Sequence, residues 1–387
     1  MRRGGRSLLL GLALGGCGGP GDGAGGPTEP AAPATEAPAP GPAPASGAPG
    51  RAPLRVGWQT TWATEAQLAL LLRDGPFLAD QGFDATFVPF SYGAPLNEAA
   101  LAGAVDVLFT ADQPALVLAN KAPQWGIIGR LMYNRVGVMS ALDGPVATPA
   151  DLRGRRLAVP FGAAAHRAAI GAARGAGVEV GADLELVNLG IEELVGVVVA
   201  GSSGGRWGEL DAVAAWDPAF AELEERKLVR TIHRENAVGL VVMDDRYEAA
   251  HPGAGARFLS ALAGATQAFA ADPLAAHQKL LAEGGTTSLA ALQRAAAVEP
   301  NLEPSAPGEA PPVPRLTLAA PDLRRLEEAA TFLHAAGIVK SPVDLAGALR
   351  PTATSAAAAK PGPEADPPTE PPPADGAQAW APEGRAP

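Results

Sequence analysis

The segment RLAVPFGAAAHRAAIGAARG, residues 156–175, contains the unit from which the rest of this chain is built. Its first five residues form a short apolar run, Phe161 and Gly162 form a turn, and an alanine-rich stretch follows. A short apolar run beside a turn is typical of a buried strand, and alanine is the strongest helix former. The segment therefore predicts a strand, a tight turn and a helix over residues 163–175.

The same order of elements occurs twice. Expected strands lie at 54–58, 84–90 and 107–109 in the first copy, and at 156–160, 184–189 and 212–215 in the second; expected helices lie at 65–73, 96–102, 163–175 and 192–200. A Gly-x-x-Asp sequence, 103–106 and 208–211, precedes the third strand of each copy. Alternating strands and helices imply a mainly parallel sheet clad by helices. We therefore expect an α/β fold with two similar lobes.

The rest of the chain predicts a return to the first lobe. A strand at 238–243 and helices around 256–271 follow the second copy, and a proline-rich surface loop is expected at 301–314. The expected boundaries are 54–138 for the first part of lobe 1, 139–235 for lobe 2, and 236–350 for the return and the C-terminal helices. Crossovers near 136–141 and 235–238 would act as hinges for closure of the lobes.

The N-terminus reads as a targeting segment. Basic residues precede an apolar run at 8–14 that is too short to span a bilayer, as in a secretory signal. Leu14-Gly15-Gly16 before Cys17, the only cysteine, resembles a bacterial lipobox. This predicts a lipoprotein signal peptide at 1–16 and lipidation of Cys17, which anchors the chain to a membrane. An ordinary signal peptide with an incidental cysteine is the alternative.

Composition separates a folded body from its ends. Residues 17–53 and 351–387 are almost wholly Pro, Ala, Gly, Ser, Thr and acidic residues, so we expect a disordered tether and a disordered tail. With Cys17 lipidated, the exported body has no thiol for a disulfide, a metal site or a nucleophile. The net charge of −11 opposes nucleic acid as a partner and suits a soluble body, which we expect to be monomeric.

Candidate ligand-binding residues lie in four loops at the carboxyl ends of predicted strands, where ligands bind in open α/β sheets. They are Gln59, Thr60, Thr61, Trp62, Thr110, Asp112, Gln113, Phe161, Gly162, Ala163, Ala164, Ala165, His166, Trp216 and Asp217. If the two lobes face each other, all four loops meet in one cleft. We expect no catalytic residue, no cofactor and no metal, because the five histidines lack metal-site spacing. His166 is the functional candidate; His233, His251, His277 and His334 are expected at the surface.

These residue types predict the ligand's chemistry. Main-chain amides at 162–166 begin a helix and suit an acidic group. Trp216 could wall the pocket. Asp112 and Asp217 occupy equivalent places in the two copies, where each could cap a helix, or one of them could pair with an amine on the ligand. The second alternative would favour a zwitterion over a bare anion.

The order of motifs resembles a known family. DLRGRRLAVPF at 151–161 followed by His166, VNL at 187–189, the Trp-x-Pro at 216–218 and LEEAATFLHAAGIVKSPVDLAGAL at 326–349 are similar to the substrate-binding proteins of ABC importers for taurine, aliphatic sulfonates and nitrate. The resemblance covers about residues 54–349. It implies the two-lobed type II periplasmic binding fold, a small anionic or zwitterionic ligand, permease and ATPase partners, and a periplasmic location. The family usually has hydroxyl side chains where this chain has residues 162–165.

Three alternatives remain beside a binding protein. Residues 201–205 match the G-x-S-x-G pattern of serine hydrolases, but a nucleophile elbow needs a helix immediately afterwards, and a strand is expected here. Thiamine-pyrimidine synthases share the fold but carry a Cys-rich motif that this chain lacks. A ligand-sensing lipoprotein without a transporter is the third. We expect a solute-binding protein rather than an enzyme.

Overall fold

The computed structural model describes residues 50–284, 287–303 and 312–354 of the 387-residue chain. The predicted signal peptide, Cys17 and most of the predicted tether and tail lie outside these residues. The folded body begins slightly earlier and ends slightly later than the composition suggests. Its first strand starts at Ala52, and a short helix at Pro351–Thr354 buries Ala353 and accepts a backbone hydrogen bond from Leu318.

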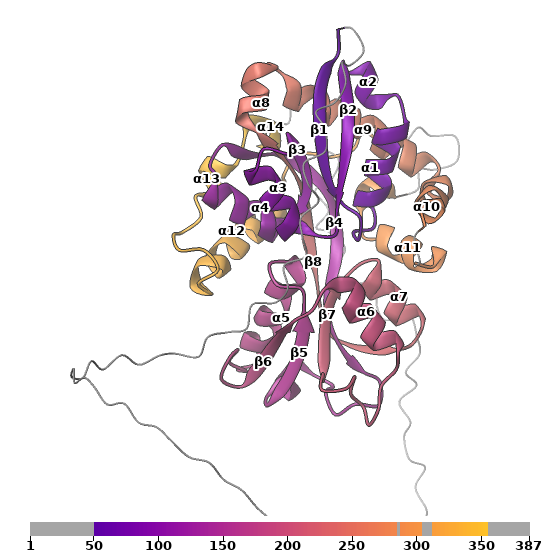
Figure 1. Cartoon of the computed structure of the whole chain (residues 1–387), viewed down its shortest axis with the longest axis vertical. Coiled ribbons are helices and arrows are strands. Elements are labelled where there is room, and N and C mark those ends of the chain that lie inside the picture. The colour runs from indigo at the N-terminus through magenta and orange to yellow at the C-terminus, as the bar shows by residue number, and fades with distance from the viewer. Residues whose placement is uncertain (1–49, 285–286, 304–311, 355–387) are drawn as a thin grey trace, which may run out of the picture. The chain divides into compact units, whose positions relative to one another are not determined.

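Eight strands form one mixed, continuous sheet (Figure 1). They are β1 (Ala52–Gln59), β2 (Phe83–Phe90), β3 (Val107–Ala111), β4 (Trp125–Ala141), β5 (Arg155–Val159), β6 (Leu184–Asn188), β7 (Ala212–Trp216) and β8 (Val229–Asp244). Their order across the sheet is β2-β1-β3-β8-β4-β7-β5-β6. We call the elements around β1–β3 the first lobe and those around β5–β7 the second lobe.

The repeated order of elements predicted from the sequence is confirmed. In the first lobe β1 pairs in parallel with β2 and β3, and in the second β5 pairs in parallel with β6 and β7. The two Gly-x-x-Asp sequences have the same role in both lobes. Asp106 accepts a hydrogen bond from the backbone N–H of Arg55 at 2.8 Å, and Asp211 accepts one from Arg156 at 3.0 Å. Each aspartate thus fixes the start of the central strand of its lobe.

The two lobes are joined by the long strands β4 and β8. These strands pair antiparallel from Trp125 opposite Asp244 to Ala141 opposite Val229. Near one end β8 also pairs with β3, and near the other β4 also pairs with β7. The sequence predicted only residues 238–243 of β8 and missed β4 as a strand. Every residue of β4 is buried, so the strand lacks the polar–apolar alternation that identifies a half-exposed strand.

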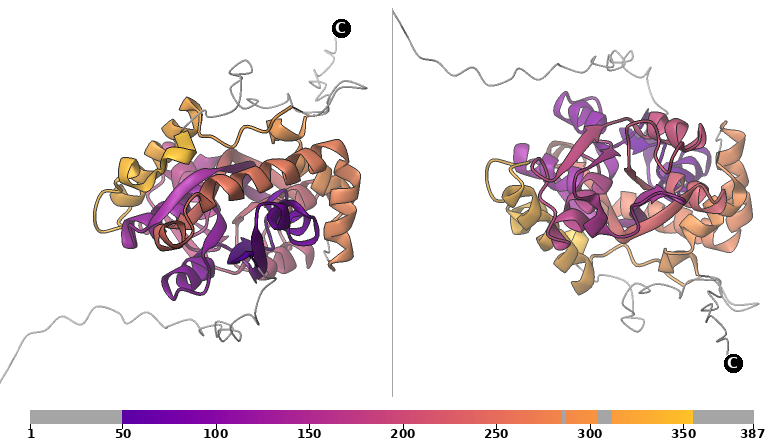
Figure 2. Two further views of the ribbon diagram at one scale, coloured as in Figure 1. Left: turned by 90° about the horizontal axis from the view of Figure 1, so that it is seen from above. Right: turned by 90° about the horizontal axis from the view of Figure 1, so that it is seen from below.

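Helices cover both faces of the sheet (Figure 2). They are α1 (Glu65–Asp74), α2 (Phe77–Asp80), α3 (Gly93–Leu101), α4 (Asp112–Lys121), α5 (Ala164–Gly175), α6 (Ile191–Val199), α7 (Ala219–Glu225), α8 (Asp245–Ala250), α9 (Ala254–Ala271), α10 (Pro273–Ala282), α11 (Leu289–Ala296), α12 (Ala320–Ala335), α13 (Leu345–Ala348) and α14 (Pro351–Thr354), with 3₁₀ turns at Pro149–Leu152 and Pro300–Leu302. In the first lobe, α1 packs with α9 and α10, and α4 packs with α3 and α12. The chain therefore places helices on the first lobe again after β8.

Buried polar contacts attach the returning segment to β4. Arg130 of β4, which is fully buried, forms a two-pronged ion pair with Glu299 at 2.7 and 2.8 Å. Tyr133 of β4 donates a hydrogen bond to Asp322 of α12, which also pairs with Arg315 at 2.7 Å. A buried charge is tolerated when it is paired and hydrogen-bonded, so these contacts hold the C-terminal segment in one register on the sheet.

His277 corrects one expectation from the sequence. It was expected at the surface, but only 1% of the residue is exposed. It lies on the inner side of α10, where Nδ1 is 2.9 Å from the side-chain amide nitrogen of Gln67 and the ring meets the edge of Phe269. Burial lowers the pKa of His277. The imidazole is a core residue that receives its hydrogen bond from a helix distant in sequence.

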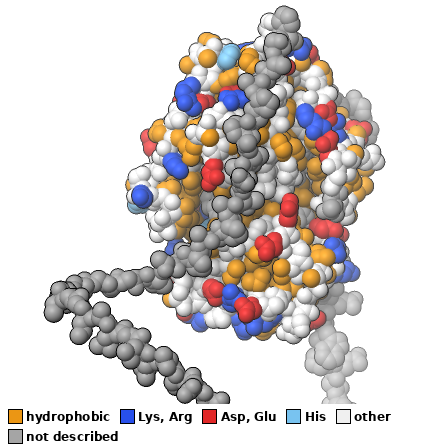
Figure 3. Space-filling model, in the orientation of Figure 1, with side chains coloured by type: hydrophobic (Ala, Val, Ile, Leu, Met, Phe, Trp, Pro, Cys, Tyr) orange, Lys and Arg blue, Asp and Glu red, His pale blue; other side chains and the backbone are white. Residues whose placement is uncertain are grey.

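The described surface carries both signs of charge. On the face shown in Figure 3, Lys and Arg side chains are interspersed with Asp and Glu side chains. None of the described helices combines the length and apolar character needed to cross a membrane.

Candidate functional site

The structure brings the four predicted loops to the junction of the two lobes. Gln59 and Thr110 continue the neighbouring parallel strands β1 and β3 of the first lobe, and Phe161 and Trp216 lie at the ends of β5 and β7 in the second. The indole nitrogen of Trp216 donates to the backbone oxygen of Thr61 at 2.9 Å, across the junction. The loops therefore lie together where the two lobes meet, and we call this place the cleft region.

Two helix N-termini converge in this region. A Cβ built on Gly162, which precedes α5, would lie 3.5 Å from the Cβ of Ala94, the second residue of α3. Gly162 has φ of +81°, a conformation that favours glycine. The first turn of an α-helix has N–H groups without intrahelical partners and carries a partial positive charge. Two such ends close together form an environment suited to an anion.

The alanines at the start of α5 are buried in the cleft region. Ala163, Ala164 and Ala165 are 5%, 1% and 0% exposed. The first turn of α5 is therefore packed against its neighbours in the described conformation. That backbone amides here supply donors to a ligand stays a prediction.

His166 and Phe161 form a stacked pair beside these amides. Their ring centroids are 4.6 Å apart and the rings are nearly parallel. The backbone N–H of Gly162 donates to His166 Nδ1 at 3.4 Å, and burial lowers the pKa of His166. The imidazole is therefore neutral near pH 7, with Nε2 as its remaining donor. Phe161 is 36% exposed, so the pair forms an aromatic edge of the cleft.

Trp216 and Trp62 pack together where the lobes meet. They are 0% and 2% exposed, and their ring centroids are 6.4 Å apart. Each comes from a different lobe, so their contact joins the two lobes. The backbone N–H of Ala63 also donates to the carbonyl oxygen of Asp217, at 3.3 Å.

Asp217 forms a buried ion pair with Arg135. Its carboxylate accepts from Arg135 of β4 at 2.6 and 2.9 Å and from the backbone N–H of Ala221 at 3.0 Å. Asp217 is fully buried and the Arg135 side chain is 6% exposed. Burial raises the pKa of Asp217, and the adjacent guanidinium opposes that rise. This geometry favours the helix-capping alternative over pairing with an amine of the ligand.

Asp112 is also paired with an arginine. Its Oδ2 lies 3.0 Å from Nη2 of Arg167, a residue of α5 in the other lobe, and its Oδ1 accepts from the N–H of Gln113. Arg167 also pairs with Glu235 of β8 at 2.8 Å. The sequence analysis did not single out Arg167. A charged residue in the first turn of an otherwise apolar helix beside His166 was the signal that could have identified it.

Several buried polar atoms in the cleft region have no hydrogen-bond partner among the described residues. They are Thr110 Oγ1, the side-chain oxygen and nitrogen of Gln113, and Arg167 Nε. Thr110 and Gln113 are both fully buried. Buried polar groups are nearly always satisfied, so these atoms are expected to meet a polar partner, such as a water molecule or a ligand.

The loop after β1 contains a second feature that sequence reasoning missed. Glu65, the first residue of α1, is fully buried and accepts from the backbone N–H of Gln59 at 2.7 Å and from its side chain at 3.3 Å. Burial raises the pKa of Glu65 to about 8. Thr64 before it has φ of +67° and its N–H bonds to Gln67. Positive φ at a non-glycine residue is strained and is common at functional sites.

Two of the predicted residues use their polar groups within the protein. Thr60 and Thr61 donate their hydroxyls to the carbonyl oxygens of Phe90 and Ser91, at 3.3 and 2.6 Å. These contacts tie the loop to the end of β2. Thr60 is exposed, whereas Gln59 is buried with Glu65 as its partner. These side chains therefore shape the loop in the described conformation.

The hydrolase pattern at residues 201–205 does not form a nucleophile elbow. The helix α6 precedes it, two short bridges (Ser203 with Arg206, and Trp207 with Leu210) follow, and the next element is β7. The segment is thus a loop between a helix and a strand, without the strand–turn–helix geometry that exposes a nucleophile. Within the described ranges, no group of three or more His, Cys, Asp or Glu residues is placed to hold a metal ion.

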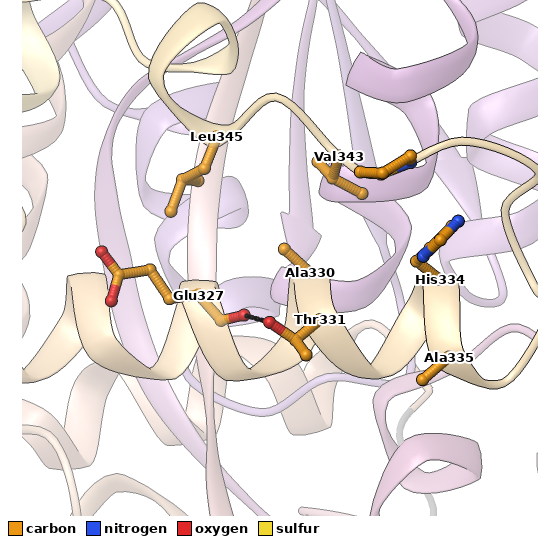
Figure 4. Close-up of a pocket in the computed structure, with 8 residues that line it drawn as sticks. Glu327, Ala330, Thr331, His334, Ala335, Val343 and Leu345 are labelled. Atoms are coloured by element: carbon orange, nitrogen blue, oxygen red, sulfur yellow. Dashed lines mark hydrogen bonds between the residues drawn. The ribbon is translucent and has the colours of Figure 1, made fainter.

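A cavity of about 380 Å³ lies elsewhere, between α12 and the segment that leads into α13 (Figure 4). It is lined by Glu327, Ala330, Thr331, His334, Ala335, Pro342, Val343 and Leu345. Thr331 donates to the backbone oxygen of Glu327 at 2.8 Å, so its hydroxyl is used within the helix. None of the predicted site residues lines this cavity.

Comparison with known proteins agrees with the fold. A taurine-binding periplasmic protein of Escherichia coli K12 is 28% identical over 180 residues, which are 46% of this chain and 52% of that protein. The alkanesulfonate-binding protein SsuA of Xanthomonas axonopodis pv. citri, solved with MOPS, superposes with a TM-score of 0.63 at 20% identity over 78% of this chain and 99% of its own. This chain resembles the taurine- and sulfonate-binding proteins in sequence and in fold.

Further comparisons define the extent of that likeness. The E. coli aliphatic sulphonate-binding protein SsuA superposes with a TM-score of 0.61 at 18% identity, covering 82% of this chain and 97% of its own. The matched segment spans about half the length of the taurine-binding relative. No protein-family model matches the chain. A desulfurization enzyme, DszB, has the same fold at a TM-score of 0.53, so the fold is shared by binding proteins and enzymes.

Proposed function

We propose that this protein is the solute-binding component of an ABC importer and that it captures a small sulfonate or a similar anion between its two lobes. The observation that carries the proposal is the convergence of the N-termini of α3 and α5 beside Arg167 and the unsatisfied side chains of Thr110 and Gln113. Amides at helix ends and the unpartnered Nε of Arg167 are hydrogen-bond donors suited to an anion. The similarity to a taurine-binding protein supports sulfonate as its chemical class.

The residues that would bind the ligand have distinct roles. Backbone amides of Ala164 and Ala165 and at the start of α3 would receive the anionic group, because those of Gly162, Ala163 and His166 already donate within the protein. Trp62 and Trp216 would exclude water from its aliphatic part. Among the described residues of the cleft region, none has the nucleophile–base geometry of a covalent catalyst. The activity we propose is binding and release of the ligand.

Capture would couple to closure of the lobes. The two lobes are joined by β4 and β8, and hinge motion within these strands would open the cleft. A ligand that contacts α3 in one lobe and α5 in the other favours the closed state, because it loses contacts when the lobes separate. The closed form would then deliver the ligand to a permease in the membrane.

The N-terminal segment would retain the protein at the outer side of the cytoplasmic membrane or in the periplasm. We propose that Cys17 carries the lipid anchor and that residues 17–49 tether the folded body to the membrane. The Cys17→Ser variant should move from the membrane fraction to the soluble fraction or remain uncleaved, with ligand binding intact. Lipid labelling of that variant equal to wild type would contradict the proposal.

A ligand screen tests the central function. Purified protein would be heated with alkanesulfonates, taurine, nitrate, amino acids and pyrimidines, and unfolding followed by fluorescence. A ligand at 100 times its Kd stabilises the fold by about 2.7 kcal/mol. We expect this stabilisation with short sulfonates and not with pyrimidines. Stabilisation by pyrimidines alone would instead support the thiamine-related alternative.

A further inference from the structure

We propose that Arg167 selects the ligand by charge: its guanidinium spans the two lobes and pairs with both Asp112 and Glu235, which without it would draw an amine into the cleft more strongly. The inference rests on the proposed function, because it concerns the same cleft and the same class of ligand. It identifies a specificity-determining residue that the sequence motifs did not reveal.

The geometry places Arg167 between two carboxylates. Its Nη2 is 3.0 Å from Asp112 Oδ2 and its Nη1 is 2.8 Å from Glu235 Oε1. The exposed fraction of the side chain is 15% for Arg167, 1% for Asp112 and 28% for Glu235. Because Arg167 belongs to α5 and Asp112 to α4, this ion pair crosses from the second lobe to the first.

The carboxylates of Asp112 and Glu235 rely on Arg167 as their cationic partner. Asp112 also accepts from the backbone N–H groups of Gln113 and Val238, and Glu235 has His233 at 3.4 Å as its other partner. None of these contacts supplies the permanent positive charge that Arg167 supplies. Without the guanidinium, a buried carboxylate is left uncompensated, and a cationic group of a ligand is then the favourable partner.

The Nε–H group of Arg167 could also donate a hydrogen bond to the ligand. Its Nε is buried and has no hydrogen-bond partner among the described residues. Thr110 Oγ1 and the amide of Gln113 flank Asp112 in the chain and are equally unsatisfied. An anionic oxygen that reached Nε would form a charge-assisted hydrogen bond, which is about twice as strong as a neutral one.

The effect of Arg167 on ligand choice can be measured by comparing the affinities of two similar ligands. Ethanesulfonate and taurine (2-aminoethanesulfonate) differ only by the amine. With Arg167 present, each carboxylate has a cationic partner and the three groups carry one net negative charge instead of two, so an amine gains less from them and still loses its hydration on entering the cleft. Removing Arg167 should therefore raise the affinity for taurine relative to that for ethanesulfonate.

The test compares the two affinities by calorimetry in three variants of the full chain. Arg167→Gln removes the charge and should shift the affinity ratio toward taurine by at least tenfold. Arg167→Lys keeps the charge and should keep the wild-type preference. Arg174→Gln is the matched control, because Arg174 is an exposed arginine of the same helix, with its guanidinium 6.0 Å from the Phe332 ring. An unchanged ratio in Arg167→Gln would overturn the inference.

A ligand-free measurement separates this inference from the proposed function. A double-mutant cycle of Arg167→Gln and Asp112→Asn should show a coupling of at least tenfold in the unfolding equilibrium, about 1.4 kcal/mol. The exposed pair of Arg156 and Glu185 should couple less than threefold in the same cycle. If neither sulfonate stabilises wild type but the coupling appears, the sulfonate function fails and the neutralising pair stands. Absence of coupling refutes the role of Arg167.

Discussion

The Asp217→Asn substitution tests whether this aspartate is structural. The change keeps the size of the side chain and one oxygen for the backbone N–H of Ala221, but it removes the negative charge that Arg135 faces at 2.6 and 2.9 Å. Arg135 is then left with Glu224, at 3.1 Å, as its remaining carboxylate. The expected result is a large loss of stability with ligand affinity retained by the folded protein.

The magnitude follows from the burial of the pair. Removing one partner of a buried ion pair costs about 3–5 kcal/mol. Because the introduced amide would keep a capping oxygen and Glu224 would remain, we expect the lower end, about 3 kcal/mol. Unfolding entropy is about 2.1 cal/mol/K per residue, which is roughly 0.6 kcal/mol/K for the roughly 300 described residues. The melting temperature should therefore fall by about 5 °C.

The assay is thermal and chemical unfolding with a matched control. Glu185→Gln makes the same carboxylate-to-amide change in a pair with Arg156 that is largely exposed, where the cost should be under about 1 kcal/mol. Calorimetry with the best sulfonate then measures affinity in each variant. Wild-type stability together with loss of binding in Asp217→Asn would refute the structural role and restore the amine-binding alternative.

Three further predictions concern the buried acid, the helix terminus and the paired strand-start motifs. Burial raises the pKa of Glu65 to about 8, so the folded state binds the carboxyl proton more tightly than the unfolded state does. Between about pH 4.5 and pH 8, the free energy of unfolding of wild type should therefore fall by up to a few kcal/mol more than that of Glu65→Gln, measured by urea unfolding at several pH values. A flat difference between the two proteins would contradict the buried position of Glu65. Ala164→Glu should lower sulfonate affinity at least 100-fold, because a negative charge would occupy the N-terminus of α5. The control Gly171→Glu, on the exposed side of α5, should leave the affinity unchanged. Equal affinities of the two variants in calorimetry would remove this helix terminus from the site. Asp106→Ala and Asp211→Ala should each destabilise the fold by about 1–3 kcal/mol, because each leaves a strand-starting N–H and an arginine unpaired; an effect in only one lobe would show that the two motifs are not equivalent.

Much of the fold was predictable from local sequence pattern. The strands and helices of both repeated units lie within a few residues of their expected positions, because apolar periodicity and turn residues act on neighbouring residues. The two Gly-x-x-Asp sequences also revealed the repeat. Strand β4 escaped this reasoning, since burial on both faces gives it no alternation.

The candidate site was predictable only as a set of loops. Topology placed the four loops at the carboxyl ends of strands, and the structure brings them to one junction. The partners of the charged residues could not be inferred in the same way. Asp217 pairs with Arg135, 82 positions away, and Asp112 with Arg167, 55 positions away.

The sequence by itself determined the order and type of the repeated elements, because side-chain periodicity and backbone propensity act over a few residues. The tertiary structure decided which charges are neutralised, which histidine is buried and how the long strands join the lobes. Such contacts depend on the packing of segments far apart in the chain, and a carboxylate beside a helix has the same local sequence whether an arginine or a ligand is its partner. His277, Arg135 and Arg167 acquire their roles only when that packing is complete.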